Sequence, residues 1–237
     1  MRVEIREPAG SDVRASVDAS LPPGEVRRGD DVVRVGAPET LDADALRTAV
    51  AAVVRALRDQ GSRLPISATI GDLPMSGLAA ILAQVEAVAA CGVDYVKVGI
   101  ERAPQPGAVL DALAATGHAI VPVFIGDRGV AFEQVEHACR LGFPALMVDT
   151  ADKRTGSLFD VLSSAELVRF VGMVRASGAL VGLAGALRRP QLDALRALGP
   201  DFAGFRSAVC AGDRSGELDP ERLRDLAAAL HAAPALV

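Results

Sequence analysis

Short runs of β-branched and other apolar residues recur along this chain, separated by longer segments whose apolar residues are spaced as in a helix. The short runs predict strands, because β-branched side chains fit the pleated and buried surface of a sheet. These runs cover residues 2–5, 31–35, 66–70, 95–100, 119–125, 145–149, 179–185 and 202–207.

The segments between the runs predict amphipathic helices. In residues 40–61, Thr40 or Asp42 can cap the start of a helix and Gly61 can end it. Similar segments follow, and several lead through a glycine directly into the next strand. Strands that alternate with helices in this way are parallel and covered on both faces. We therefore expect an α/β fold, a (β/α)8 TIM barrel.

The first strand–helix unit is irregular. Residues 7–30 contain a Pro-Pro pair, three glycines and little apolar periodicity, which favours a loop or a broken helix. No linker or low-complexity tract divides the rest, and 237 residues suit one barrel of roughly 250 residues. We expect a single domain over residues 1–237.

The scarcity of lysine draws attention to the two that are present. Lysine and arginine together number 25, but only Lys97 and Lys153 are lysines, so 23 are arginines. A coding bias toward arginine explains generic surface cations, and a lysine retained against it is a candidate for amine chemistry. Arginine stays protonated near neutral pH, whereas a lysine amine can lose its proton and form a Schiff base.

Charge and cysteine content exclude several classes of function. The net charge of −5 argues against a general affinity for nucleic acid. The three cysteines show no CxxC spacing that would suggest a disulfide framework or a zinc site, so we expect no metal. No apolar run reaches the roughly 18 residues of a membrane span, and the N-terminus resembles no signal peptide. We expect a cytoplasmic protein that contacts no membrane.

Candidate catalytic residues lie where strands end, since the active sites of such barrels lie at the C-terminal ends of the strands. Lys97 stands between Val96 and Val98 in a strand, so its side chain points away from theirs. A charged group inside a barrel is costly unless it is paired or used. Asp149 ends a strand and Lys153 follows four residues later, a spacing that suits a proton-transfer pair.

The loops after the last two strands, residues 182–189 and 204–216, are rich in glycine. Loops at this place in a barrel often bind phosphate through backbone N–H groups and a helix N-terminus. The candidate substrate- and phosphate-binding residues are Asp72, Gly185, Arg206, Ser207 and Gly212. With the lysines and Asp149, they indicate aldolase-like chemistry on a phosphorylated small molecule.

Each candidate also has a structural interpretation. Asp149 and Lys153 could form a loop salt bridge and helix cap, and Asp72 could fix a turn. Arg206 could neutralise a neighbouring carboxylate. A purely structural interpretation is weakest for Lys97, because an apolar strand interior gives little reason for a lone amine.

Five segments carry a resemblance to a known family: ISATIGDLP (66–74), DYVKVGI (94–100), MVDTADKRTGSLFD (147–160), GLAGALR (182–188) and GPDFAGFRSAVC (199–210). They resemble the (5-formylfuran-3-yl)methyl phosphate synthases, also called 4-(hydroxymethyl)-2-furancarboxaldehyde-phosphate synthases. The resemblance implies a class I aldolase-like barrel that condenses two molecules of glyceraldehyde 3-phosphate. The product is a furan precursor of methanofuran or methylofuran, and neither metal nor organic cofactor is implied.

The resemblance also implies roles for individual residues. Lys97 matches the catalytic lysine of the strand motif, and Asp149 and Lys153 match the acid–base pair. Arg206 and the glycines around it fall in the phosphate-binding loops.

One position departs from the family. Members typically carry Asp and Lys at the end of the second strand, where this chain has Arg34 and Gly36. In a synthase with this departure, Lys97 or Lys153 would have to form the imine. The alternatives are a non-catalytic or regulatory paralogue, or another phosphosugar lyase or isomerase. In each case we expect a homo-oligomer.

Overall fold

The computed structural model describes residues 43–102, 106–152, 156–211 and 218–231, and four short strands before residue 43. The main sheet is built from β1 (Arg2–Ile5), β2 (Arg14–Asp18), β5 (Ser67–Thr69), β6 (Tyr95–Ile100), β7 (Ile120–Ile125), β8 (Ala145–Asp149), β9 (Leu180–Leu183) and β10 (Phe202–Gly204). Its spatial order is β1-β2-β10-β9-β8-β7-β6-β5. A separate two-stranded sheet pairs β3 (Glu25–Val26) with β4 (Val33–Arg34).

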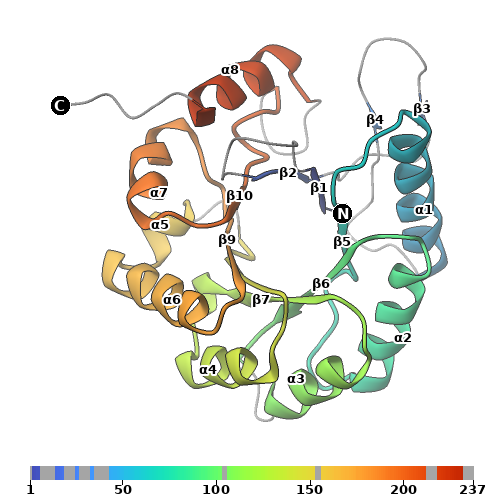
Figure 1. The fold of residues 1–237 in the computed structure, drawn as a ribbon, viewed down its shortest axis with the longest axis vertical. Helices are drawn as coiled ribbons and strands as arrows, with labels where there is room; N and C mark the ends of the chain where they lie inside the picture. Colours follow the sequence, from blue (N-terminus) through green and yellow to red (C-terminus); the bar gives the residue numbers. More distant parts are fainter. Residues whose placement is uncertain are drawn as a thin grey trace.

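Helices surround the strands (Figure 1). They are α1 (Ala43–Asp59), α2 (Leu78–Ala89), α3 (Pro106–Ala115), α4 (Phe132–Leu141), α5 (Leu158–Val161), α6 (Ser164–Ala176), α7 (Leu192–Leu198) and α8 (Pro220–His231), with short 3-10 turns η1 (Gly126–Arg128) and η2 (Arg189–Gln191). From β5 to β10 each strand pairs in parallel with the next, joined by helical crossovers. Among the described residues, no helix is both long and apolar enough to cross a membrane.

The six expected strands from β5 to β10 are confirmed, and they form a parallel α/β half-barrel. The complete (β/α)8 barrel is not what the described strands show. β2 continues the parallel pairing beside β10, but β1 pairs antiparallel with β2. β1 also lies against β5, which curls the sheet into a ring-like arrangement (Figure 1).

Two expectations for the N-terminal region need correction. The strand expected at 31–35 is present at Val33–Arg34, but it pairs with β3 in a separate sheet and not within the main sheet. Residues 14–18, expected in a loop or broken helix, form β2. Apolar Ala15 and Val17 alternate there with polar residues, the period that suits a strand. The other residues between 7 and 30, apart from β3, lie outside the described part of the chain.

Alternation along the strands divides the apolar residues into two cores. Val96, Val98 and Ile100 of β6 belong to the larger core, between the sheet and the helices. The opposite face contributes a smaller core inside the curled sheet, made of Val121, Val123, Ala145, Met147, Ala184 and Phe202, with Tyr95 and Leu180 packed against it. On β6, the side chains that alternate with Val96, Val98 and Ile100, starting with Tyr95, therefore point into the interior of the curled sheet.

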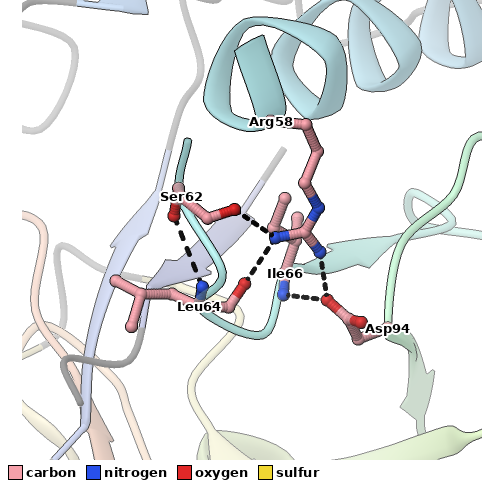
Figure 2. A network of polar contacts seen from close by, with 5 residues as sticks. All are labelled: Arg58, Ser62, Leu64, Ile66 and Asp94. Carbon is pink, nitrogen blue, oxygen red and sulfur yellow. Dashed lines mark hydrogen bonds and ion pairs between the residues drawn. The ribbon is translucent and has the colours of Figure 1, made fainter. Parts of the chain in front are cut away.

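A polar network fixes the start of β5 against the start of β6 (Figure 2). Arg58, at the end of α1, donates to the carbonyls of Ser62 (3.1 Å) and Leu64 (2.8 Å) and pairs with the Asp94 carboxylate at 2.7 Å. Asp94 in turn accepts the N–H of Ile66 at 2.6 Å and donates its own N–H to the Ile66 carbonyl at 2.8 Å.

The same arrangement recurs four strands away. Asp201, just before β10, accepts the N–H of Val181 in β9 at 2.7 Å and donates its N–H to the Val181 carbonyl at 2.9 Å. Asp94 and Asp201 lie in similar segments, GVDY and GPDF. A carboxylate thus fixes the relative position of two neighbouring strands at the N-terminal end of the sheet in both halves.

Gly182 allows close packing inside the sheet. It pairs with Met147 on one side and Phe202 on the other. A Cβ at this position would overlap the Phe202 ring and lie 2.5 Å from Met147 Cγ.

We predict that Gly182→Ala lowers the free energy of unfolding by about 1–3 kcal/mol, the cost of overpacking a well-packed core. Gly172→Ala is the matched control, because Gly172 lies on α6 and a Cβ there would meet no neighbouring atom within 4 Å. That variant should gain about 0.5–1 kcal/mol from helix propensity. Chemical denaturation of both measures the difference; equal stability of the two variants would contradict this account of Gly182.

Candidate active site

Buried polar side chains gather on the interior face and C-terminal edge of the sheet. Ser67 on β5, Lys97 on β6 and Asp149 on β8 all stand at positions of their strands that face the interior. Their exposed fractions are 2%, 1% and 2%. Arg206, two residues beyond the end of β10, is 8% exposed. The predicted interior orientation of Lys97 is confirmed, because Val96 and Val98 pack toward the helices.

Lys97 lies deeper in the sheet than Asp149. Lys97 pairs with Thr69 on one side and Val121 on the other, whereas Asp149, the last residue of β8, pairs with Ile125 at the end of β7. The Lys97 backbone therefore lies within the sheet, and Asp149 lies at its C-terminal edge. That edge is where active sites of parallel α/β folds form.

The segment after β8 is held by hydrogen bonds to carboxylates. The N–H of Thr150 donates to Asp149 Oδ1 at 2.7 Å. The next two N–H groups, of Ala151 and Asp152, donate to the two carboxylate oxygens of Asp127 at 2.8 and 2.7 Å. Asp127 lies in η1, directly after β7, and sequence reasoning did not single it out.

Gly185 allows the loop after β9 to approach the loop after β8. Its φ of +120° is a conformation that favours glycine, and a Cβ there would lie 2.9 Å from Thr150 Cγ2. Its carbonyl accepts the N–H of Leu158 at 2.8 Å. Gly185 thus has a packing role, and its predicted contact with phosphate stays a prediction.

The other candidate residues are placed as follows. Asp72, after β5, is exposed, and Ser207 is half-buried beside Arg206. Lys153 and Gly212 lie outside the described residues. Within the described ranges, no three His, Cys, Asp or Glu residues gather as ligands for a metal ion.

Comparisons with a family model and with known proteins point to the same family. Residues 25–227 match the family model described as 4-HFC-P synthase. The (5-formylfuran-3-yl)methyl phosphate synthase of Archaeoglobus fulgidus is 32% identical over 180 residues, which cover 70% of this chain and 76% of the relative. The synthase of the same name from Methanopyrus kandleri is 35% identical over 181 residues, with the same coverage.

A solved structure supports the fold. Phosphoribosyl anthranilate isomerase from Thermus thermophilus superposes with a TM-score of 0.53 at 20% identity, over 78% of this chain and 79% of the isomerase. At this identity the likeness shows the fold alone.

The start of α5, just after the candidate site, makes a pH-dependent contribution to stability. The Ser157 hydroxyl and its backbone N–H both donate to Asp160 Oδ2 at 2.7 Å, and these bonds lower the pKa of Asp160 below its ordinary value of 3.8. A lowered pKa means that the stabilisation is present above the unfolded-state pKa and lost as the pH falls through the folded-state pKa.

We predict that Asp160→Asn lowers the melting temperature at neutral pH and that this difference from the unmodified protein shrinks as the pH falls below 3.8. Ser157→Ala removes the hydroxyl bond and keeps the backbone one, so it should reproduce part of the effect. Thermal denaturation at a series of pH values measures both; a difference that does not change with pH would contradict the assignment.

Proposed function

Since the chain belongs to the 4-HFC-P synthase family, we propose that it condenses two molecules of glyceraldehyde 3-phosphate into (5-formylfuran-3-yl)methyl phosphate. The reaction is balanced when two triose phosphates lose one phosphate and two water molecules. The observation that carries the proposal is a buried lysine on the interior face of β6, together with a buried aspartate on the same face at the C-terminal end of β8.

In this proposal Lys97 forms the imine. Its amine attacks the aldehyde carbon of one triose phosphate, and water leaves as the C=N bond forms. Burial suits this step, because a water-poor interior slows hydrolysis of the imine. Lys153 is the alternative nucleophile, and the experiment below distinguishes the two.

Asp149 is proposed as the acid–base group. A carboxylate at the rim can remove a proton from the carbon next to the imine and can return protons to leaving hydroxyl groups. The resulting carbon nucleophile attacks the aldehyde of the second triose, forming the new carbon–carbon bond. Ring closure by a hydroxyl group onto the imine carbon then breaks the carbon–nitrogen bond and returns the Lys97 amine, and loss of water and phosphate leads to the aromatic furan.

Arg206 is proposed to bind a substrate phosphate. Its guanidinium is largely buried at the end of β10, and arginine suits bidentate contact with phosphate oxygens. Neighbouring Ser207 and the glycine-rich loops after β9 and β10 would add hydroxyl and backbone N–H donors.

The departure at the second-strand position favours a second candidate function. Arg34 and Gly36 replace the Asp and Lys expected from the family resemblance, and β4 pairs outside the main sheet. A non-catalytic paralogue that binds a phosphorylated ligand without turning it over fits this observation.

The test is incubation with glyceraldehyde 3-phosphate, followed by furan absorbance, released phosphate, and borohydride trapping with peptide mass analysis. We expect furan and phosphate in equal amounts and a reduced adduct on the peptide that contains Lys97. Lys97→Met keeps the stem and removes the amine, so turnover should fall by at least about 10³-fold. Lys153→Met should still form the adduct.

The other outcomes point elsewhere. An adduct on Lys153 would move the imine to that residue, and furan without any adduct would indicate acid–base chemistry alone. Neither furan nor adduct, from a folded protein, would exclude the synthase and favour the non-catalytic paralogue.

A further inference from the structure

We propose that Asp127 is a positioning residue, which sets the conformation of residues 149–152 and so orients the carboxylate of Asp149. The functional part of this inference rests on the proposed function, in which Asp149 moves protons. Asp127 itself acts through the backbone of the neighbouring loop.

The geometry of Asp127 suits this role. Its two carboxylate oxygens accept the consecutive N–H groups of Ala151 (2.8 Å) and Asp152 (2.7 Å). Hydrogen bonds to a charged acceptor are stronger than neutral ones, and two of them fix both position and rotation of the peptide groups. The loop after β7 thus holds the loop after β8.

Asp127 can hold that loop because its own turn is fixed. The carbonyl of Gly126 accepts the N–H of Gly129 at 3.0 Å, which closes the η1 turn. A Cβ on Gly126 would lie 3.1 Å from Leu162 Cδ1 and 3.4 Å from the carbonyl oxygen of Asp149, so the turn packs directly on the end of β8.

The next residue extends the same chain of contacts to β6. Arg128 pairs with Glu101, the residue that follows β6, at 2.6 Å. Along the C-terminal edge, an ion pair therefore connects the loop after β6 to the loop after β7. The two hydrogen bonds of Asp127 connect the loop after β7 to the loop after β8.

The link reaches Asp149 through one peptide group. The N–H of Thr150 donates to Asp149 Oδ1 at 2.7 Å, and Thr150 immediately precedes the two residues that Asp127 holds. A rotation of the backbone at 150–152 would therefore move an N–H group that is hydrogen-bonded to the carboxylate.

Asp72 provides an internal comparison. The tripeptide Ile-Gly-Asp occurs at the C-terminal ends of both strands, directly after β5 at 70–72 and from the last residue of β7 at 125–127. The Asp72 side chain is exposed and makes no hydrogen bond to a neighbouring loop among the described residues. The motif alone does not create the contact; the loop after β8 supplies the partner.

The test compares Asp127→Ala and Asp127→Asn with Asp201→Asn. Asp201 makes the same type of bond, to the Val181 N–H, at the opposite end of the sheet. We expect Asp127→Ala to lower kcat on the order of 10- to 100-fold with KM little changed, because misplacement of a reacting group costs rate rather than binding. The limb of the pH–rate profile that belongs to Asp149 should shift as well. Asp127→Asn, which keeps one acceptor oxygen, should be intermediate.

A second readout needs no activity. Hydrogen exchange of the Ala151 and Asp152 amides should accelerate about tenfold or more in Asp127→Ala, since each loses a charge-assisted bond. Asp201→Asn should lower stability while leaving kcat, the pH profile and these two amides unchanged.

Unchanged exchange at 151 and 152 would overturn the positioning role itself. Faster exchange with unaltered kcat and pH profile would overturn its functional part. If the unmodified protein makes no furan, the proposed function fails, and the exchange experiment alone then decides whether Asp127 sets the loop.

Discussion

Parallel pairing from β5 to β10 is the constraint on which the candidate site depends. Strands that run in one direction bring all their C-terminal ends to one edge, so loops far apart in the sequence meet there. The two-residue period of a strand then selects which side chains enter the interior. Lys97 and Asp149 stand on different strands, yet both obey that period, and this alone places an amine and a carboxylate on the same face.

Carboxylates stabilise both ends of this sheet, with different consequences. At the N-terminal end, Asp94 and Asp201 each bind the backbone of the preceding strand, and Arg58 adds a charged partner to the first (Figure 2). At the C-terminal end, Asp127 binds a loop rather than a strand. In folds of this type the first end serves stability and the second carries chemistry, so the same interaction would serve stability in two places and orientation in the third.

The sequence predicted the parts that depend on local pattern. The six strands from β5 to β10 follow from their β-branched runs, and the direction of Lys97 follows from its valine neighbours. The strand predicted at residues 31–35 is present at Val33–Arg34 but lies outside the main sheet, because a short apolar run suits a small hairpin as well as a barrel strand. Asp127 was missed because its role depends on N–H groups 24 and 25 residues later in the chain, which no local pattern reveals.

The second-strand position connects the altered sequence with the fold. There this chain has an arginine and a glycine instead of the Asp and Lys expected from the family resemblance, and β4 pairs with β3 and not with β5. A lysine at this position could serve an imine mechanism only if the strand lined the interior. Because Gly36 carries no side-chain amine, this position supplies no nucleophile in the proposed function. The proposed amine and acid–base chemistry then rests on Lys97, Asp149 and the loop after β8. The hydrogen bonds by which Asp127 holds that loop would therefore matter more here than in a protein that keeps a second-strand lysine.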